Sequence, residues 1–265
     1  MNHLLKHLLT GVGRTVSRQS PGRPKAGASD PEGSPLARTG ADIRPEPTAG
    51  EDQTVHSEAD FRAYAGRDWR HYQELVSTCV AHGEPGPILD LGAGLGFFVE
   101  ACRRYGLPCI GLEGSKYAVE TALARYPMDI RHHQLSEPLP FENDTFSVVM
   151  CNQTIEHLSP DGARFVLRQS YRVLAKGGLL AVYSPCRHNP EQATDPTHIN
   201  LYDPHRLTRE VLAAGFSDYR AVDSPRRLLG ASEPARLLMT ALHRFTHWDF
   251  LSASANCLAY KARAE

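Results

Sequence analysis

The sequence predicts an α/β fold, in which a parallel β-sheet lies between helices on both of its faces. From Phe61 onward, short apolar runs alternate with segments of helical periodicity, which is typical of such sheets. A glycine-rich turn joins the first predicted strand to the next helix. None of the 9 Phe, 2 Trp and 10 Tyr residues precedes Phe61, so the folded domain starts near that residue.

The first 56 residues have the composition of a tail. Gly and Pro occupy 13 of the first 50 positions, and without large apolar side chains this stretch cannot bury enough surface to offset the entropy of ordering it. Residues 1–29 carry five Lys and Arg and no acid, whereas residues 30–60 carry eight acids. We therefore predict a disordered or weakly helical tail over residues 1–56, basic and then acidic. Leucines near helical spacing leave open a weak contact of residues 1–18 with a membrane surface.

The domain is predicted to span residues 57–265 and to open with a helix over residues 57–82. Ser57 and Asp60 have the spacing of a capping box. Aromatic and aliphatic residues then recur at helical intervals. The Gly- and Pro-rich run 83–87 ends this helix.

The later elements follow from apolar runs and from capping residues. Val148 and Val149 make the fourth strand strongly β-like. Ser115 and the pair Ser159–Pro160 are good helix starts, and glycines mark helix ends. The predicted strands are 88–91, 109–112, 130–135, 146–151, 179–184, 219–222 and 256–261. The predicted helices after the first are 97–105, 115–126, 159–174, 207–214 and 232–247.

Composition argues against several classes of function. The formal net charge of −1 gives no global field that would select nucleic acid, so we expect no nucleic-acid partner. The six cysteines form no CxxC pair, which indicates buried thiols in a reducing, cytoplasmic setting. No run of about 18 apolar residues is present, so we expect no transmembrane segment.

The sharpest motif is the glycine-rich run 89–96. Gly92 and Gly94 let the backbone turn sharply and approach a ligand, because no Cβ obstructs it. Glu113, at the end of the second predicted strand, can accept both hydroxyls of an adenosine ribose, a feature shared by NAD and S-adenosyl-L-methionine sites. Asp90 favours the second cofactor, since a fixed anion repels a pyrophosphate but suits an ammonium and a sulfonium.

With these motifs the chain resembles the class I S-adenosylmethionine-dependent methyltransferases, in particular the small-molecule branch that includes ubiquinone-biosynthesis enzymes. The resemblance runs from Ile88 to Phe216. It implies a Rossmann-like, seven-stranded, mostly parallel sheet whose last strand is antiparallel. It rests on residues 89–96, 111–115, 139–141, 146–149, 152–158, 174–178 and 214–216.

The resemblance also implies where the cofactor binds. The glycine loop cradles its amino-acid part, Glu113 holds the ribose, and residues near Leu135 and Ser136 flank the adenine. Leu135 departs from the family, because many relatives carry an Asp there that binds the adenine amino group. Ser147 likewise replaces the usual Asp after Phe146. The predicted cofactor-binding residues are Asp90, Gly92, Ala93, Gly94, Gly96, Glu113, Gly114, Leu135, Ser136 and Asn152.

Methyl transfer is an in-line displacement, so the protein mainly aligns the acceptor atom with the C–S bond. A hydroxyl acceptor is also helped by a general base, and open α/β sheets bind ligands beyond the carboxyl ends of their strands. His198, in the loop after the fifth strand, is our first candidate, because histidine titrates near neutrality. The alternative is that His198 only holds loop backbone. His157 is a weaker candidate, and its alternative is packing and capping of the next helix.

We expect no metal site from the sequence. His132 and His133 are neighbours in a predicted strand and would point to opposite faces. His243 and His247 share a predicted helical face but have no third ligand spaced nearby.

The sequence therefore predicts a methyltransferase that transfers the methyl group of S-adenosylmethionine to a small-molecule acceptor, at a hydroxyl oxygen. Residues 185–205 and 225–255 are expected to cover the acceptor site. Two other interpretations stay open. A non-catalytic relative acting as a partner protein would bind cofactor without turnover, and a nicotinamide-dependent oxidoreductase would bind NAD(H) instead.

Overall fold

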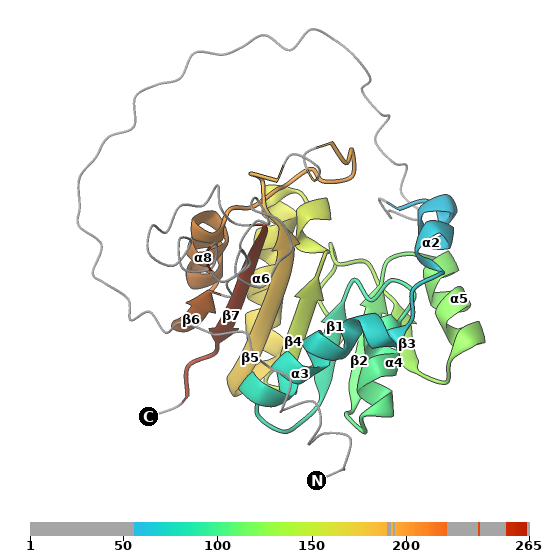
Figure 1. Cartoon of the computed structure of the whole chain (residues 1–265). Coiled ribbons are helices and arrows are strands. Elements are labelled where there is room, and N and C mark those ends of the chain that lie inside the picture. Colours follow the sequence, from blue (N-terminus) through green and yellow to red (C-terminus); the bar gives the residue numbers. More distant parts are fainter. Residues whose placement is uncertain (1–55, 190–191, 193, 222–237, 239–252, 264–265) are drawn as a thin grey trace, which may run out of the picture.

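The computed structural model describes residues 56–189, 192, 194–221, 238 and 253–263 (Figure 1). Its centre is a seven-stranded sheet with the strand order β3-β2-β1-β4-β5-β7-β6. The strands are β1 Ile88–Leu91, β2 Cys109–Glu113, β3 Asp129–His132, β4 Phe146–Asn152, β5 Leu174–Pro185, β6 Asp218–Ala221 and β7 Ser254–Tyr260.

Strands β1 to β5 pair in parallel, and β7 runs antiparallel to both β5 and β6. This confirms the predicted α/β fold, including the antiparallel last strand. Because the first five strands share one direction, the ends of β1, β2, β4 and β5 meet at the same edge of the sheet. The order reverses at β1, which is where open sheets of this kind bind ligands.

Helices cover both faces of the sheet (Figure 1). The helices are α2 Glu58–Tyr64, α3 Gln73–His82, α4 Phe97–Arg104, α5 Lys116–Arg125, α6 Pro160–Val173 and α8 Pro204–Ala213, with 3₁₀ turns η1 Trp69–Tyr72 and η2 Ile155–His157. Alternate strand residues face opposite ways, so β4 places Val149 and Cys151 in one core and Val148 and Met150 in the other.

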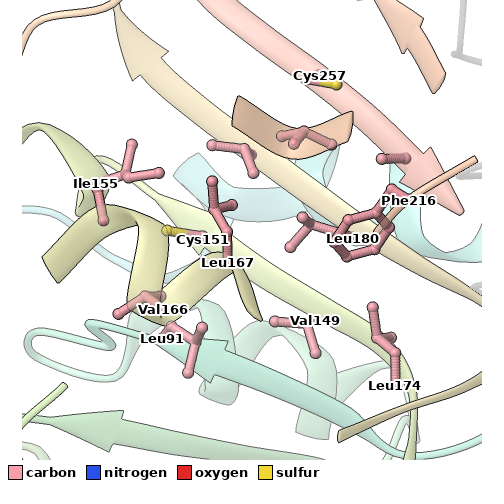
Figure 2. Packing of buried hydrophobic residues seen from close by; sticks show 14 of the residues in the cluster. Leu91, Val149, Cys151, Ile155, Val166, Leu167, Leu174, Leu180, Phe216 and Cys257 are labelled. Atoms are coloured by element: carbon pink, nitrogen blue, oxygen red, sulfur yellow. The ribbon is translucent and has the colours of Figure 1, made fainter. Parts of the chain in front are cut away.

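The first core lies between the sheet and helices α6 and α8. Figure 2 shows Val166 and Leu167 of α6 beside Leu91, Cys151 and other strand residues. The second core lies between the opposite face and helices α3 and α4. Most of these side chains are fully buried, so the edge of the sheet that carries the loops is held on a rigid support.

The predicted single helix over residues 57–82 is wrong. The structure divides it into α2, η1 and α3. Ser57 and Asp60 do form the expected capping box of α2. However, Asp68 caps η1 in the same way, by accepting a hydrogen bond from the Arg70 N–H, and so starts a new element inside the predicted helix.

The start of β5 also differs from the prediction. Helix α6 ends at Val173 rather than at the glycine pair, and β5 begins at Leu174, whose backbone is extended and pairs with Phe146. Gly177, with φ of 80°, lies within an irregular part of this strand where the register against β4 shifts. The third strand is shorter than predicted and ends at His132.

The predicted tail lies outside the described residues, apart from His56. So do the predicted helix 232–247, apart from Leu238, and most of the proposed cover 225–255. In the parts of the chain that are described, no helix is both long and apolar enough to cross a membrane.

Candidate active site

The glycine loop follows β1 at the carboxyl edge of the sheet. Gly92, Gly94 and Gly96 all have positive φ, at 72°, 54° and 72°, which only glycine adopts at little cost. A Cβ on Gly92 would collide with the side chain of Thr154. A Cβ on Gly94 would meet no described atom within 4 Å, so the space beside Gly94 is open.

Glu113, the last residue of β2, is 8% exposed and fastens this loop. The Gly94 N–H donates to its Oε2 at 2.7 Å, and the Ser115 N–H donates to its Oε1 at 2.9 Å. Each carboxylate oxygen can accept a further hydrogen bond. The carboxylate is therefore oriented by backbone amides, as a group that binds a pair of hydroxyls needs to be.

Asp90 lies within β1 and is 4% exposed. Its side chain accepts no hydrogen bond from the residues that the structure describes. Burial disfavours the carboxylate and, together with repulsion from Glu113, raises the pKa of Asp90 to about 8. A cation placed beside it would reverse this effect.

The other predicted cofactor residues also lie at this edge. Asn152 ends β4 and is half-buried, and Ser136 is exposed. Leu135 packs into the first core with 9% exposure, so its side chain is occupied there. The carbonyl of Gly114 accepts hydrogen bonds from His132 Nε2 at 2.9 Å and Gln134 Nε2 at 3.0 Å.

A second group of polar side chains gathers beyond β4 and β5. Glu156 and His157 belong to the turn η2 after β4, and His198 comes from the loop after β5. One ligand-type atom from each of the three lies within 4.8 Å of the others. The rings of His157 and His198 have centroids 5.0 Å apart. We call these three residues the Glu–His–His cluster.

Thr154 joins the two groups. Its Oγ1 donates to the Leu91 carbonyl at 3.0 Å, and its side chain packs against Gly92. Thr154 itself lies two residues before Glu156 in the chain. Gln153, with φ of 53°, makes the sharp turn that brings Thr154 back onto the glycine loop. The Glu–His–His cluster is therefore built onto the same turn that supports the loop.

Backbone carbonyls fix both imidazoles. His157 Nδ1 lies 3.0 Å from the Thr197 carbonyl, and His198 Nδ1 lies 2.9 Å from the Gln192 carbonyl. A carbonyl only accepts, so each Nδ1 carries the proton and each Nε2 presents a lone pair. The Asp195 carboxylate lies 3.7 Å from His198 Nε2.

Burial sets the charge of Glu156 and His157. It raises the pKa of Glu156, a fully buried residue, to about 7, and it lowers the pKa of His157 to about 4. The Ser184 hydroxyl donates to Glu156 Oε2 at 3.2 Å, but Oε1 has no partner among the described residues. His157 is thus neutral near pH 7.

Two participants were missed by sequence reasoning. Glu156 precedes a histidine just before a helix start, and the cap of that helix, α6, is Ser159 as predicted, which accepts from the Gly162 N–H. This also removes capping as a role for His157. His56 lies in what was predicted as tail, but its Nε2 is 3.3 Å from His157 Nε2. No local pattern marks that contact.

Comparison with known proteins agrees with this geometry. Residues 89–182 match the methyltransferase domain family. The chain is 27% identical over 210 residues to a protein from Alkalilimnicola ehrlichii named ubiquinone biosynthesis O-methyltransferase, covering 72% of this chain and 82% of that protein. It is 28% identical over 146 residues to the uncharacterized methyltransferase YcgJ of Bacillus subtilis. That match covers 53% of this chain and 56% of YcgJ, so the chain spans just over half of that relative.

The fold comparison points the same way. The crystal structure of an S-adenosylmethionine-dependent methyltransferase from Archaeoglobus fulgidus superposes with a TM-score of 0.56 at 17% identity, covering 73% of this chain and 92% of that one. The matched domain contains both the glycine loop and Glu113. Residues 89–182 form a methyltransferase domain, of the class I S-adenosylmethionine-dependent type. The prediction from sequence is confirmed for the fold, the enzyme class and the cofactor.

The residues of this site fit S-adenosylmethionine. S-adenosylmethionine carries an ammonium and a sulfonium, and Asp90 provides a buried carboxylate that no described group satisfies. The open space beside Gly94 and the oriented carboxylate of Glu113 suit an adenosine with two ribose hydroxyls. When bound, the cofactor supplies a methyl group on a cationic sulfur, and the chain's own residues hold and orient it.

Proposed function

We propose that this methyltransferase transfers the methyl group to a hydroxyl oxygen of a small-molecule acceptor, bound between the glycine loop and the Glu–His–His cluster. The observation that carries the proposal is the placement of His198 beside the glycine loop. Its side chain is 7% exposed, its Nδ1 lies against the Gln192 carbonyl, and its ring belongs to the cluster beside the loop.

A neutral hydroxyl is a poor nucleophile, so methyl transfer to it is faster when a base takes up all or part of its proton. The His198 Nε2 lone pair does this in our proposal, and the Asp195 carboxylate stabilises the imidazolium that forms. His157 is the weaker base because burial lowers its pKa to about 4, so we assign it a positioning role. The name of the A. ehrlichii relative, an O-methyltransferase, supports oxygen as the acceptor atom.

The test is turnover on a panel of hydroxyl-bearing and amine-bearing small molecules by the wild type and by His198→Ala. We expect turnover on hydroxyl acceptors only, and a loss of kcat of about 100-fold or more in the variant. His188→Ala is the matched control, because His188 is an exposed histidine in the same loop. Affinity for S-adenosylhomocysteine should be unchanged in both variants. Turnover of His198→Ala within about twofold of wild type would contradict the proposal.

A further inference from the structure

We infer that Glu156, His157 and His198 hold a divalent transition-metal cation beside the cofactor loop. This inference rests on the proposed function and specifies how the acceptor hydroxyl is activated. We predicted no metal site from the sequence, because we considered only pairs of histidines that lie close together in the chain. In the structure the three groups come from two different loops and meet at the carboxyl edge of the sheet.

The ligand set is close to what one cation requires. Ligand atoms about 2.1 Å from a metal lie at most about 4.2 Å apart. The candidate atoms of the cluster already lie within 4.8 Å of one another. Small rotations of these three side chains would bring their ligand atoms to the spacing that one cation requires.

Glu156 supplies an independent indication. The residue is fully buried, and its Oε1 has no hydrogen-bond partner among the described residues, whereas Oε2 accepts from Ser184. Leaving a buried carboxylate oxygen without a donor is unfavourable, so such atoms usually have a partner. A cation in the cluster would be that partner.

The surroundings of the imidazoles also match a metal site. Histidine ligands usually donate their second ring N–H to a carbonyl or carboxylate, which fixes the tautomer and aims the other nitrogen at the metal. His157 and His198 both do so, through Thr197 and Gln192. His56 Nε2, which donates to His157 Nε2 in this structure, would give up that hydrogen bond when the cation binds.

Two imidazoles and one carboxylate favour Mn²⁺, Fe²⁺, Co²⁺ or Zn²⁺ over Mg²⁺ or Ca²⁺, and they leave coordination positions open. In our inference the acceptor hydroxyl takes one of these. A bound hydroxyl ionises more easily, and its proton leaves to solvent. The oxygen then bonds to the methyl carbon as the C–S bond breaks, and the sulfur leaves as a neutral thioether. His198 in this case holds the cation rather than the proton.

The experiment is cation binding to the full chain, first stripped with EDTA. Zn²⁺ binding is followed by calorimetry and Co²⁺ binding by its visible absorption. We expect one cation per chain, and affinity weakened about 10- to 100-fold or more in Glu156→Gln and in His198→Asn. His188→Ala should bind like wild type. Equal S-adenosylhomocysteine affinity in all four proteins shows that they are folded. No saturable binding, or wild-type binding by both cluster variants, would overturn the inference.

Turnover separates this inference from the proposed function. If the EDTA-stripped protein methylates a hydroxyl acceptor at the full rate, the cation is not needed, and the inference falls while the proposed function stands. If one cation binds through the cluster but no hydroxyl acceptor is methylated, the metal site stands and the proposed function falls. If activity is lost with EDTA and restored by Zn²⁺ or Co²⁺, methyl transfer to a hydroxyl and the metal site are both supported, and His198 acts as a cation ligand rather than as the base.

Discussion

The cofactor side and the proposed acceptor side of the candidate active site are built in different ways. On the cofactor side, the backbone amides of Gly94 and Ser115 meet one carboxylate, Glu113, and three glycines in the left-handed region shape the loop. On the acceptor side, side chains from separate loops meet in the Glu–His–His cluster. The first is encoded locally and depends on glycine conformation, whereas the second exists only once the sheet has formed.

The two sides also differ in how their glutamates are satisfied. Both oxygens of Glu113 accept backbone hydrogen bonds, whereas Glu156 has one oxygen that no described group satisfies. Both oxygens of Glu113 are therefore already bonded within the loop, whereas Glu156 keeps one oxygen without a partner among the described residues.

The sharpest way to break this comparison is a matched pair of substitutions. Glu113→Gln replaces one accepting oxygen by a donor that faces a backbone N–H, so we expect affinity for S-adenosylhomocysteine to fall about 100-fold. Glu156→Gln should keep that affinity within about twofold of wild type while lowering turnover. Calorimetry measures the affinity. Equal losses of cofactor affinity in the two variants would mean that the sides are not separable.

A second pair tests the loop itself. Gly92→Ala places a Cβ against Thr154 in addition to the strain of a positive φ, whereas Gly94→Ala carries only the strain. We expect Gly94→Ala to lower the free energy of unfolding by about 1–2 kcal/mol and Gly92→Ala by about 1–3 kcal/mol more. Urea unfolding without ligand measures both. A Gly92→Ala protein as stable as Gly94→Ala would show that Thr154 moves away without cost.

The pH dependence of stability tests Asp90. Its pKa of about 8 in the folded protein lies above its ordinary value of 3.8, so the folded state holds the proton more tightly. The stability that this proton contributes is complete below pH 3.8 and is lost as pH rises through about 8. Between about pH 6 and about pH 9, wild type should therefore lose more unfolding free energy than Asp90→Asn. Parallel pH profiles for the two proteins would contradict this role.

The smallest effect is expected from removing the N-terminal segment. A chain beginning at Val55 keeps His56 and the Ser57 cap of α2. We expect its cofactor affinity and turnover to stay within about twofold of the full chain. Turnover and calorimetry on both proteins measure this. Loss of cofactor binding would make residues 1–54 part of the enzyme.

Sequence reasoning predicted the elements whose signals are local. Ser57, Ser115 and Ser159 cap helices as expected, and the strands around the glycine loop lie within a few residues of their predicted bounds. It failed where two local signals compete. Asp68 starts a new element inside an apparently continuous helical pattern, and Leu174 leaves α6 for a strand because Phe146 pairs with it.

The same distinction applies to the site. The glycine loop, Asp90 and Glu113 could be named because they lie in one strand-turn-helix motif and at the end of the next strand, whereas Leu135, Ser136 and Asn152 were named from the family resemblance. His198 was named for its chemistry, but the residues around it were not. Glu156 comes close to His198, and His56 comes close to His157, only through the tertiary fold.

The position of β7 has a consequence for biosynthesis. Ser254–Tyr260 lies between β5 and β6, and it is the one strand that pairs with β6 in the part of the chain that the structure describes. A ribosome therefore exposes β5 and β6 before the strand that joins them has left the exit tunnel. Until then β5 presents an open edge to any extended chain nearby. The sheet therefore cannot close until β7, which follows both of its neighbours in the chain, has been made.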